Sequence, residues 1–249
     1  MNRNNERLLL GSAILALLMF PHASRADARC NDRTIKGAYI YASTGVRDGA
    51  PYVEAGQDIF DGKGGITNTY TDTTGQTVVT KGSYEMNANC VSQAKYDDSG
   101  VNYVMYTGPT GSEFSWISVT PGTKITGREV RVSTSLTPKC SLKTLKGTYV
   151  YSHIGYRDGV QYIESGQEVF DGKGSIRNTF TDASGMTVTT AGTYLMGDYC
   201  IGETRYQDTG DTYSVYVDPK GDAFTYASMT SRSGNLAVGS ERRVGKQVK

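Results

Sequence analysis

The chain has 249 residues and is almost balanced in charge, with 26 Lys and Arg residues against 25 Asp and Glu residues. This length allows two domains of ordinary small size. The sequence has no cluster of basic residues, which argues against nucleic-acid binding and polybasic membrane binding, since both need clustered Lys and Arg. We therefore predict no nucleic-acid partner.

The first residues predict a secretory signal peptide over residues 1–28. Arg3 and Arg7 give it a positive start, and residues 8–20 form an apolar run that is too short for a membrane-spanning helix. An Ala-Asp-Ala stretch ending at residue 28 is a small-x-small cleavage site, so we expect the mature chain to begin near Arg29. An uncleaved anchor is the alternative. We predict a periplasmic or secreted protein with no integral membrane segment after signal removal.

The rest of the sequence is a tandem duplication. Residues 60–64 (Phe-Asp-Gly-Lys-Gly) recur as residues 170–174, and close to half of the residues aligned at this offset are identical without a gap over residues 30–120. A repeat of this length indicates whole domains rather than the units of a solenoid. We therefore predict a first domain over residues 29–134 and a second over residues 139–249.

Each copy carries two cysteines at the same spacing. An even number of cysteines in an exported chain favours disulfides. The simplest pairing stays within each copy and joins Cys30 to Cys90 and Cys140 to Cys200. Each bridge would close a loop of about 60 residues and stabilise its domain by roughly 3–4 kcal/mol. A free reactive thiol is the alternative for any of the four.

The local pattern predicts strands throughout both copies. Short segments rich in Tyr, Val, Thr and Phe alternate with Gly, Asp and Asn turns, and no segment after the signal has helical periodicity. Along residues 78–86 every second residue is the same in both copies, which is typical of a strand with one constrained face. About eight such strands per copy predict an all-β fold of two tandem eight-stranded antiparallel barrels. A β-sandwich is the alternative, because turn spacing does not separate the two architectures.

The face that the two copies share combines aromatic and ionisable residues. Buried carboxylates and guanidinium groups are costly unless they are paired. In one interpretation Glu54 or Glu129 pairs with Arg131 in a structural network, and in the other these groups line an aromatic cavity that binds a small ligand. The candidate ligand-binding residues are Tyr39, Tyr41, Glu54, Asn68, Tyr84, Trp116, Glu129 and Arg131 in the first copy, and Tyr149, Tyr151, Glu164, Asn178, Tyr194, Tyr226, Glu241 and Arg243 in the second.

The spacing of turn and strand residues resembles a known family. The pattern Gly37-x-Tyr39, Gly56-x3-Phe60-Asp61-Gly62-x-Gly64-x-Ile66, Gly82-x-Tyr84 and then Cys90 resembles bacterial exported domains with the allene oxide cyclase-like barrel, and the second copy repeats it. The resemblance implies an eight-stranded antiparallel barrel, related in shape to lipocalin-like and dirigent-like barrels. Some members of that wider group are cyclases of small oxygenated or polyene substrates. No motif here allows the plant cyclase residues to be carried over, and fold does not fix function.

The residue inventory limits the chemistry. His153 is the only histidine after the signal, and Ser43 takes its place in the first copy, so a Ser-His-Asp triad and a histidine-based zinc site are not expected. No glycine-rich phosphate loop precedes a helix, and we predict no cofactor and no metal. The candidate catalytic residues are Glu54 and Glu164, because a desolvated carboxyl with a raised pKa can act as a general acid or base.

Three functions follow from these observations. The first is an exported tandem barrel that binds a small, mostly apolar or aromatic ligand in the barrel interior. The alternatives are a cofactor-independent cyclase or isomerase and a structural envelope module with filled barrels. The interior volume separates them, because a cavity below roughly 100 Å³ would hold only water and would count against both ligand hypotheses. The sequence does not indicate the oligomeric state.

Overall fold

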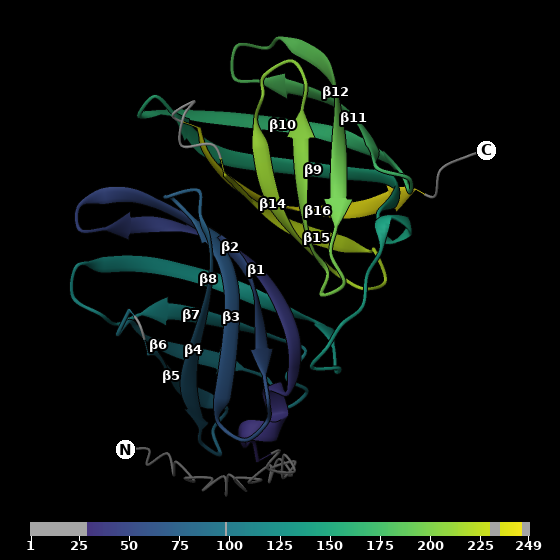
Figure 1. Ribbon diagram of the computed structural model, residues 1–249. Coiled ribbons are helices and arrows are strands. Elements are labelled where there is room, and N and C mark those ends of the chain that lie inside the picture. The colour runs from purple at the N-terminus through teal and green to yellow at the C-terminus, as the bar shows by residue number, and fades with distance from the viewer. Residues whose placement is uncertain (1–28, 98, 230–234, 246–249) are drawn as a thin grey trace, which may run out of the picture.

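The computed structural model describes residues 29–97, 99–229 and 235–245, so the predicted signal peptide lies outside the described residues. The chain forms two closed eight-stranded antiparallel β-barrels in tandem (Figure 1). This confirms the predicted fold and excludes the β-sandwich alternative. Within the described ranges, no helix is long and apolar enough to cross a membrane.

Each barrel is a simple meander in which every strand pairs with the next and the last strand pairs with the first. The first barrel follows a short 3₁₀ helix, η1 (Asp32–Ile35), and contains β1 (Gly37–Arg47), β2 (Ala50–Phe60), β3 (Gly65–Asp72), β4 (Thr77–Met86), β5 (Val91–Tyr96), β6 (Asn102–Thr107), β7 (Glu113–Ser118) and β8 (Thr123–Ser133). The second follows η2 (Leu142–Thr144) and contains β9 (Lys146–Arg157), β10 (Val160–Asp171), β11 (Ser175–Asp182), β12 (Thr187–Met196), β13 (Ile201–Tyr206), β14 (Thr212–Val217), β15 (Ala223–Ser228) and β16 (Leu236–Gly245).

Local sequence explains the strands and their turns. Along β7 exposed and buried residues alternate strictly, which places Phe114 and Trp116 inside the first barrel. The long β1–β2 hairpin turns on Asp48 and Gly49, which both have positive φ angles of 52° and 84°. An Asp-Gly pair favours this two-residue turn because both of its central residues need positive φ.

Aromatic rings and a disulfide close one end of each barrel. In the first barrel the rings of Tyr39, Phe60, Tyr84 and Phe114 pack edge to face or tilted, with centroids 5.1 to 5.5 Å apart. The Tyr84 hydroxyl donates to the carbonyl of Asp32 at 2.8 Å, which holds η1 against this end. The predicted disulfides are both present, with Cα–Cα distances of 5.0 Å for Cys30–Cys90 and 4.8 Å for Cys140–Cys200.

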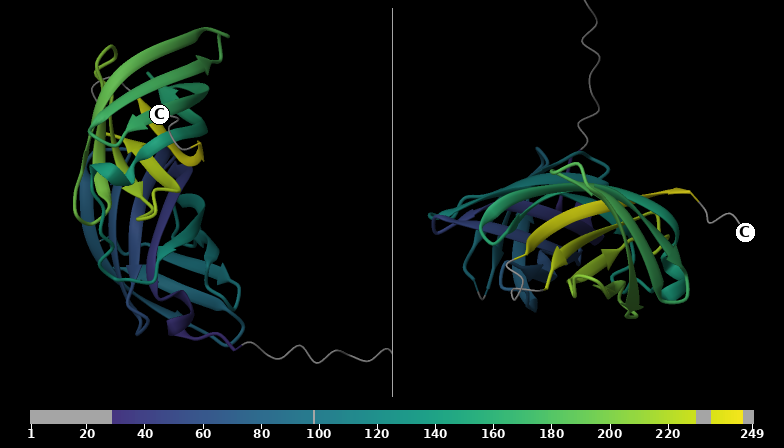
Figure 2. Two further views of the ribbon diagram at one scale, coloured as in Figure 1. Left: turned by 90° about the vertical axis from the view of Figure 1, so that its right-hand side faces the viewer. Right: turned by 90° about the horizontal axis from the view of Figure 1, so that it is seen from above.

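The two barrels pack against each other through their outer walls (Figure 2). The first barrel contributes β1, β2 and β3, and the second contributes β14, β15 and β16. Val53 and Tyr216 are fully buried in a shared apolar cluster, and the Tyr216 hydroxyl bonds to the Thr71 hydroxyl at 2.9 Å. This contact explains why β2 is buried on both faces over residues 52–58, whereas β10 alternates between buried and exposed residues.

Removing one disulfide tests how far each barrel depends on its own bridge. Replacing Cys30 and Cys90 with alanine is expected to lower the free energy of unfolding of the first barrel by about 3–4 kcal/mol, because the unfolded chain regains the freedom of the opened loop. Trp116 is the single tryptophan and lies inside this barrel, so its fluorescence in a urea titration follows the transition. The matched control replaces Cys140 and Cys200 and should shift the Trp116 transition less. An unchanged Trp116 midpoint in the first variant would contradict the expectation.

Candidate functional site

Three carboxyl groups project into the interior of each barrel, above the aromatic end. In the first barrel they are Glu54 and Asp58 on β2 and Glu129 on β8, all almost completely buried. They line one cavity together with Tyr41, Asn68, Ala94, Tyr96, Tyr103, Met105 and Trp116. An array of buried acids inside a closed sheet has to be neutralised by protons, hydrogen bonds or cations.

Glu54 is held by tyrosine hydroxyls. The Tyr41 and Tyr52 hydroxyls donate to its two oxygens at 2.5 Å each, and the Asn68 amide donates to the Tyr41 hydroxyl at 2.9 Å. Burial raises the pKa of Glu54, while these donated hydrogen bonds and the charge of Arg47 lower it. The Arg47 guanidinium stacks over the Tyr52 ring at 3.8 Å, so the open end of the barrel carries one cation close to this acid.

Asp58 and Glu129 form a deeper acidic pair. Burial raises the pKa of Asp58 to about 7, despite a hydrogen bond from the Tyr96 hydroxyl at 3.0 Å. The pKa of Glu129 is raised well above its usual range, first by burial and then by the charge of Asp58. Glu129 Oε2 finds no hydrogen-bond partner in the described part of the chain. The pair therefore retains at least one proton at neutral pH.

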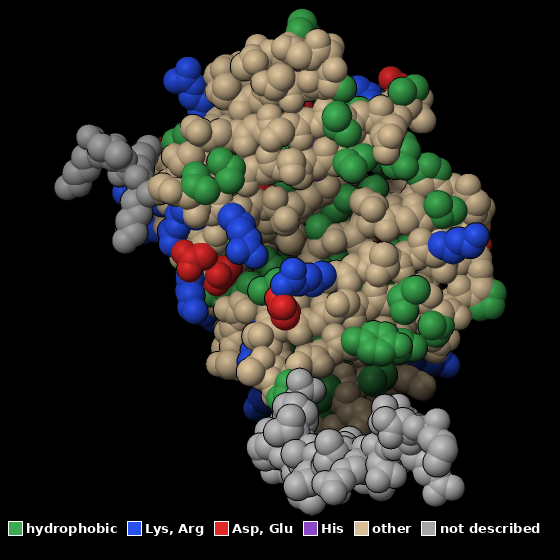
Figure 3. All heavy atoms as spheres, turned by 180° about the vertical axis from the view of Figure 1, so that it is seen from behind, with side chains coloured by type: hydrophobic (Ala, Val, Ile, Leu, Met, Phe, Trp, Pro, Cys, Tyr) green, Lys and Arg blue, Asp and Glu red, His purple; other side chains and the backbone are tan. Residues whose placement is uncertain are grey.

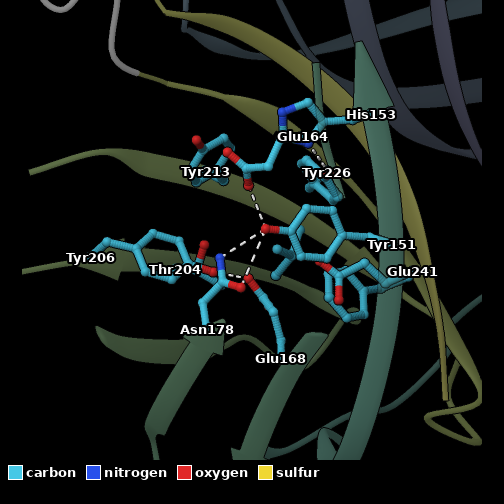
Figure 4. Close-up of a pocket in the computed structure, with 12 residues that line it drawn as sticks. Tyr151, His153, Glu164, Glu168, Asn178, Thr204, Tyr206, Tyr213, Tyr226 and Glu241 are labelled. Carbon is cyan, nitrogen blue, oxygen red and sulfur yellow. Dashed lines mark hydrogen bonds between the residues drawn. The ribbon is translucent and has the colours of Figure 1, made fainter. Parts of the chain in front are cut away.

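The second barrel repeats this arrangement (Figure 4). The Tyr151 hydroxyl donates to Glu164, and the Tyr206 hydroxyl donates to Glu168. The Tyr162 hydroxyl also donates to Glu164. Burial raises the pKa of Glu168 to about 7, and the pKa of Glu241 lies well above its usual range through burial and the charge of Glu168. In both barrels, therefore, tyrosine hydroxyls donate hydrogen bonds to buried carboxyl groups, and burial raises the pKa of the acidic pair.

His153 distinguishes the two interiors. Its Nδ1 lies 2.6 Å from the Tyr226 hydroxyl, and its Nε2 lies 3.2 Å from the Tyr162 hydroxyl. Burial lowers the pKa of His153 to about 4, so the ring is neutral at pH 7. The chain His153–Tyr162–Glu164 has no counterpart in the first barrel, where Ser43 replaces the histidine and donates to the Glu54 carbonyl at 3.4 Å.

The free volume inside each barrel is small. The cavity among the carboxyl groups measures about 20 Å³ in the first barrel and about 30 Å³ in the second. A single water molecule needs at least about 10–15 Å³ measured this way, and ligand pockets usually span about 300–1,000 Å³. Among the residues that the structure describes, no group of three or more His, Cys, Asp or Glu side chains is suited to hold a metal ion.

The predicted site residues fall into three groups. Those that line the cavities are Tyr41, Glu54, Asn68, Trp116 and Glu129, with Tyr151, Glu164, Asn178, Tyr226 and Glu241. Tyr39, Tyr84, Tyr149 and Tyr194 lie at the closed ends, where their hydroxyls donate to backbone carbonyls, for example from Tyr149 to Gly221 at 2.6 Å and from Tyr194 to Leu142 at 2.7 Å. Arg131 and Arg243 lie at the rims of those ends.

The interpretation in which Arg131 pairs with Glu54 or Glu129 is wrong. The Arg131 guanidinium donates to the carbonyls of Thr110 at 2.7 Å and Thr34 at 3.3 Å. Arg131 lies two residues beyond Glu129 on β8, about 7 Å further along the strand, and its long side chain reaches past the end of the wall. Arg243 behaves in the same way and pairs with Asp222.

The sequence comparison missed Asp58, its counterpart Glu168, and the two tyrosines that donate hydrogen bonds to them, Tyr96 and Tyr206. Asp58 and Glu168 differ in length, so a comparison that counts only identical residues passes over them. A comparison by charge would have found them. Tyr96 and Tyr206 are identical in the two copies, but they were not included among the residues of the shared inward face.

Comparison with known proteins adds no function. No protein-family model and no curated protein matches the sequence. Among solved structures, the chain is similar to a DUF3598-family protein of unknown function from Nostoc punctiforme (10% identity, 87% of this chain and 100% of that chain, TM-score 0.30). It is also similar to transferrin binding protein B from Neisseria meningitidis (8%, 84% and 76%, TM-score 0.34) and kievitone hydratase from Nectria haematococca (7%, 88% and 91%, TM-score 0.28). None of these three is described as allene oxide cyclase-like, so that resemblance stays a prediction.

The acidic pairs predict that stability falls as pH rises from about 5 to 8. An ordinary Asp or Glu titrates near pH 4, whereas Asp58 and Glu168 titrate near 7 in the folded protein. Between these values the folded state binds more protons than the unfolded chain, so raising the pH favours unfolding. The slope is about 1.4 kcal/mol per pH unit for each extra proton.

Urea titrations at several pH values measure this slope. Asp58→Asn combined with Glu168→Gln should flatten it, because one titrating carboxyl of each pair is removed. Glu113→Gln is the matched control, since this acid is exposed and paired only with Arg128 on the surface. A free energy of unfolding that rises with pH over this interval would contradict the assignment.

Proposed function

We propose that the protein is an exported module whose two barrels work with filled interiors and whose partners bind the outer walls. The cavity volume carries the proposal, because about 20 and 30 Å³ leave room for water and not for a small-molecule ligand. A structural module with filled barrels is the sequence-based alternative that this geometry favours. The interior-ligand hypothesis would need a rearrangement of the buried tyrosines.

Export is part of the proposal. The predicted signal peptide supports it, and so do two disulfides at the expected positions, because disulfides persist mainly in oxidising compartments. A periplasmic or secreted location also explains why each small barrel carries a covalent bridge near its closed end.

The polar interior fits a structural role. Each acid that accepts tyrosine hydroxyls fixes the rings around it, and a hydrogen-bonded network in a low-dielectric interior specifies one arrangement of the wall. The raised pKa values of the acidic pairs favour protonation, which lowers the charge buried in each barrel. The buried carboxyl groups and tyrosines therefore have a structural role that requires no bound ligand.

The second barrel supports a second candidate, which is acid–base chemistry of the cyclase or isomerase type at its open end. Burial raises the pKa of Glu164. Its carboxyl accepts a hydrogen bond from the hydroxyl of Tyr162, which is only partly buried. A neutral His153 contacts the same hydroxyl. A carboxyl, a phenol and a neutral imidazole that are linked by hydrogen bonds can transfer protons in enzymes.

Mass spectrometry under native conditions separates a filled barrel from a ligand carrier. Protein purified from its own host is expected to have the mass of the mature chain with two disulfides and nothing else bound. The control is a denatured spectrum of the same sample, which gives the covalent mass. A small molecule that appears only in the native spectrum would overturn the filled-barrel proposal.

Substituting the central carboxylates separates the structural role from the catalytic one. Glu54→Gln and Glu164→Gln each place an amide against a tyrosine hydroxyl that donates to the carboxylate, and each is expected to lower the free energy of unfolding by about 1–3 kcal/mol. Urea titration measures the loss, and Glu113→Gln on the surface is the control. A Glu164→Gln protein with unchanged stability would favour the acid–base candidate over the structural one.

A further inference from the structure

The contact between the barrels joins two different faces of one repeated domain. The first barrel offers the face of β1–β3, and the second offers the face of β14–β16. Because the domains are copies, the second barrel still has a free counterpart of the first face, on β9–β11. The first barrel likewise has a free counterpart of the second face, on β6–β8. A contact between unlike faces can be repeated by further copies.

The free β9–β11 face keeps two of the apolar side chains of its buried counterpart, while Ser165 stands where Ala55 is buried. Ile163 is the counterpart of Val53, and it is 50% exposed where Val53 is fully buried. Val150 is the counterpart of Ile40 and is also exposed, as is the neighbouring Ile154. Apolar residues that are exposed together at the positions of a known interface make this face a candidate for a second interface.

The free β6–β8 face matches in part, since Lys124 and Thr126 stand where Leu236 and Val238 pack at the contact. Tyr106 is the counterpart of Tyr216, and it is 56% exposed where Tyr216 is fully buried. Ile117, also exposed, stands where Ala227 is buried against the first barrel. Figure 3 shows apolar side chains exposed on the walls of both barrels.

The hydrogen bond between the barrels has an unused equivalent. Thr71 bonds both to the Thr77 hydroxyl at 2.8 Å and to the Tyr216 hydroxyl at 2.9 Å. Its counterpart Thr181 bonds in the same way to the Thr187 hydroxyl at 2.9 Å. The residue equivalent to Tyr216 is Tyr106, which a second copy of the chain would supply. Both halves of the polar contact are therefore present on the free faces.

The β9–β11 face is also continuous with the existing interface. Ile154 and Ile163 border a groove of about 700 Å³ whose opposite wall includes Thr44 and Thr126 of the first barrel. A barrel docked on β9–β11 would lie beside this groove, next to the two barrels that already pack against each other.

We infer that the protein self-associates head to tail, with the β6–β8 face of the first barrel in one copy docking on the β9–β11 face of the second barrel in another copy. The inference rests on the proposed function in that the outer walls, and not the interiors, make the contacts. It names a second copy of the chain as their partner.

The free faces differ from their counterparts in ways that weaken the contact. Val104 replaces Ser214, which bonds to Thr77 at 3.1 Å within the chain. Arg128, in an exposed ion pair with Glu113, occupies the β8 wall. The association is therefore reversible and depends on concentration.

Sedimentation velocity of the mature full chain from about 1 to 100 µM tests this association. The weight-average mass is expected to rise at least about twofold above that of the monomer. Ile163→Lys and Tyr106→Lys should each abolish the rise, because each buries an unpaired charge in one of the two faces. Leu195→Lys is the matched control, since Leu195 is 70% exposed on β12 and belongs to neither face.

Mixing the two variants gives the sharper result. The Ile163→Lys protein retains its β6–β8 face and the Tyr106→Lys protein retains its β9–β11 face, so an equimolar mixture should form a dimer and nothing larger. If each face instead docked on the same face of another copy, mixing the two variants would not restore association. The inference is overturned if the unmodified chain stays monomeric, if either variant alone still associates, or if the mixture stays monomeric.

Circular dichroism melting curves confirm that both variants are folded before they are compared. A monomeric chain with empty native mass spectra would end this inference and leave the filled-barrel proposal standing. A bound interior ligand together with concentration-dependent association would overturn the filled-barrel proposal and leave the self-association inference standing.

Discussion

Closing eight strands on themselves leaves an interior whose volume is set by strand number, and the side chains of these barrels fill almost all of it. Three acids per barrel share that space with aromatic rings, so their charge has to be managed without bulk water. Tyrosine hydroxyls supply the hydrogen bonds, and the acidic pairs keep protons. The placement of the rings and the pH dependence of stability both follow from this arrangement.

The outer walls differ between the two barrels in what they contact, whereas the interiors are alike. Both interiors retain a similar carboxyl and tyrosine framework, with His153 in the second barrel and Trp116 in the first among the differences. On the walls, equivalent apolar residues are buried where they meet the other barrel and exposed where they do not. Ala227 and Val53 pack closely at the contact, and their counterparts Ile117 and Ile163 remain apolar and exposed. Function that acts through walls can thus vary while the fold stays constant.

The duplication made the fold predictable, because two copies of one domain reveal which residues of each strand face inward. Turn residues such as Asp48 and Gly49 and the cysteine spacing completed the prediction. The site was only partly predictable. Glu54, Asn68 and Glu129 were found because they are identical in both copies, whereas Asp58 and Glu168 differ by one methylene group. Arg131 was misplaced because a strand pattern gives the side of a residue and not its height along the barrel. The contact between the barrels was not predicted, since residues at its centre such as Val53 have equally apolar counterparts such as the exposed Ile163.

The meander topology carries a further consequence. Because β8 returns to β1 and β16 returns to β9, every strand has two neighbours and neither barrel presents an open backbone edge. A chain built in this way does not recruit other chains by adding strands, which is the route to amyloid-like growth. Any assembly it forms is held by side chains alone. One substitution on a wall can therefore create or dissolve an assembly while the folded unit persists, which gives a duplicated barrel a reversible way to acquire new partners.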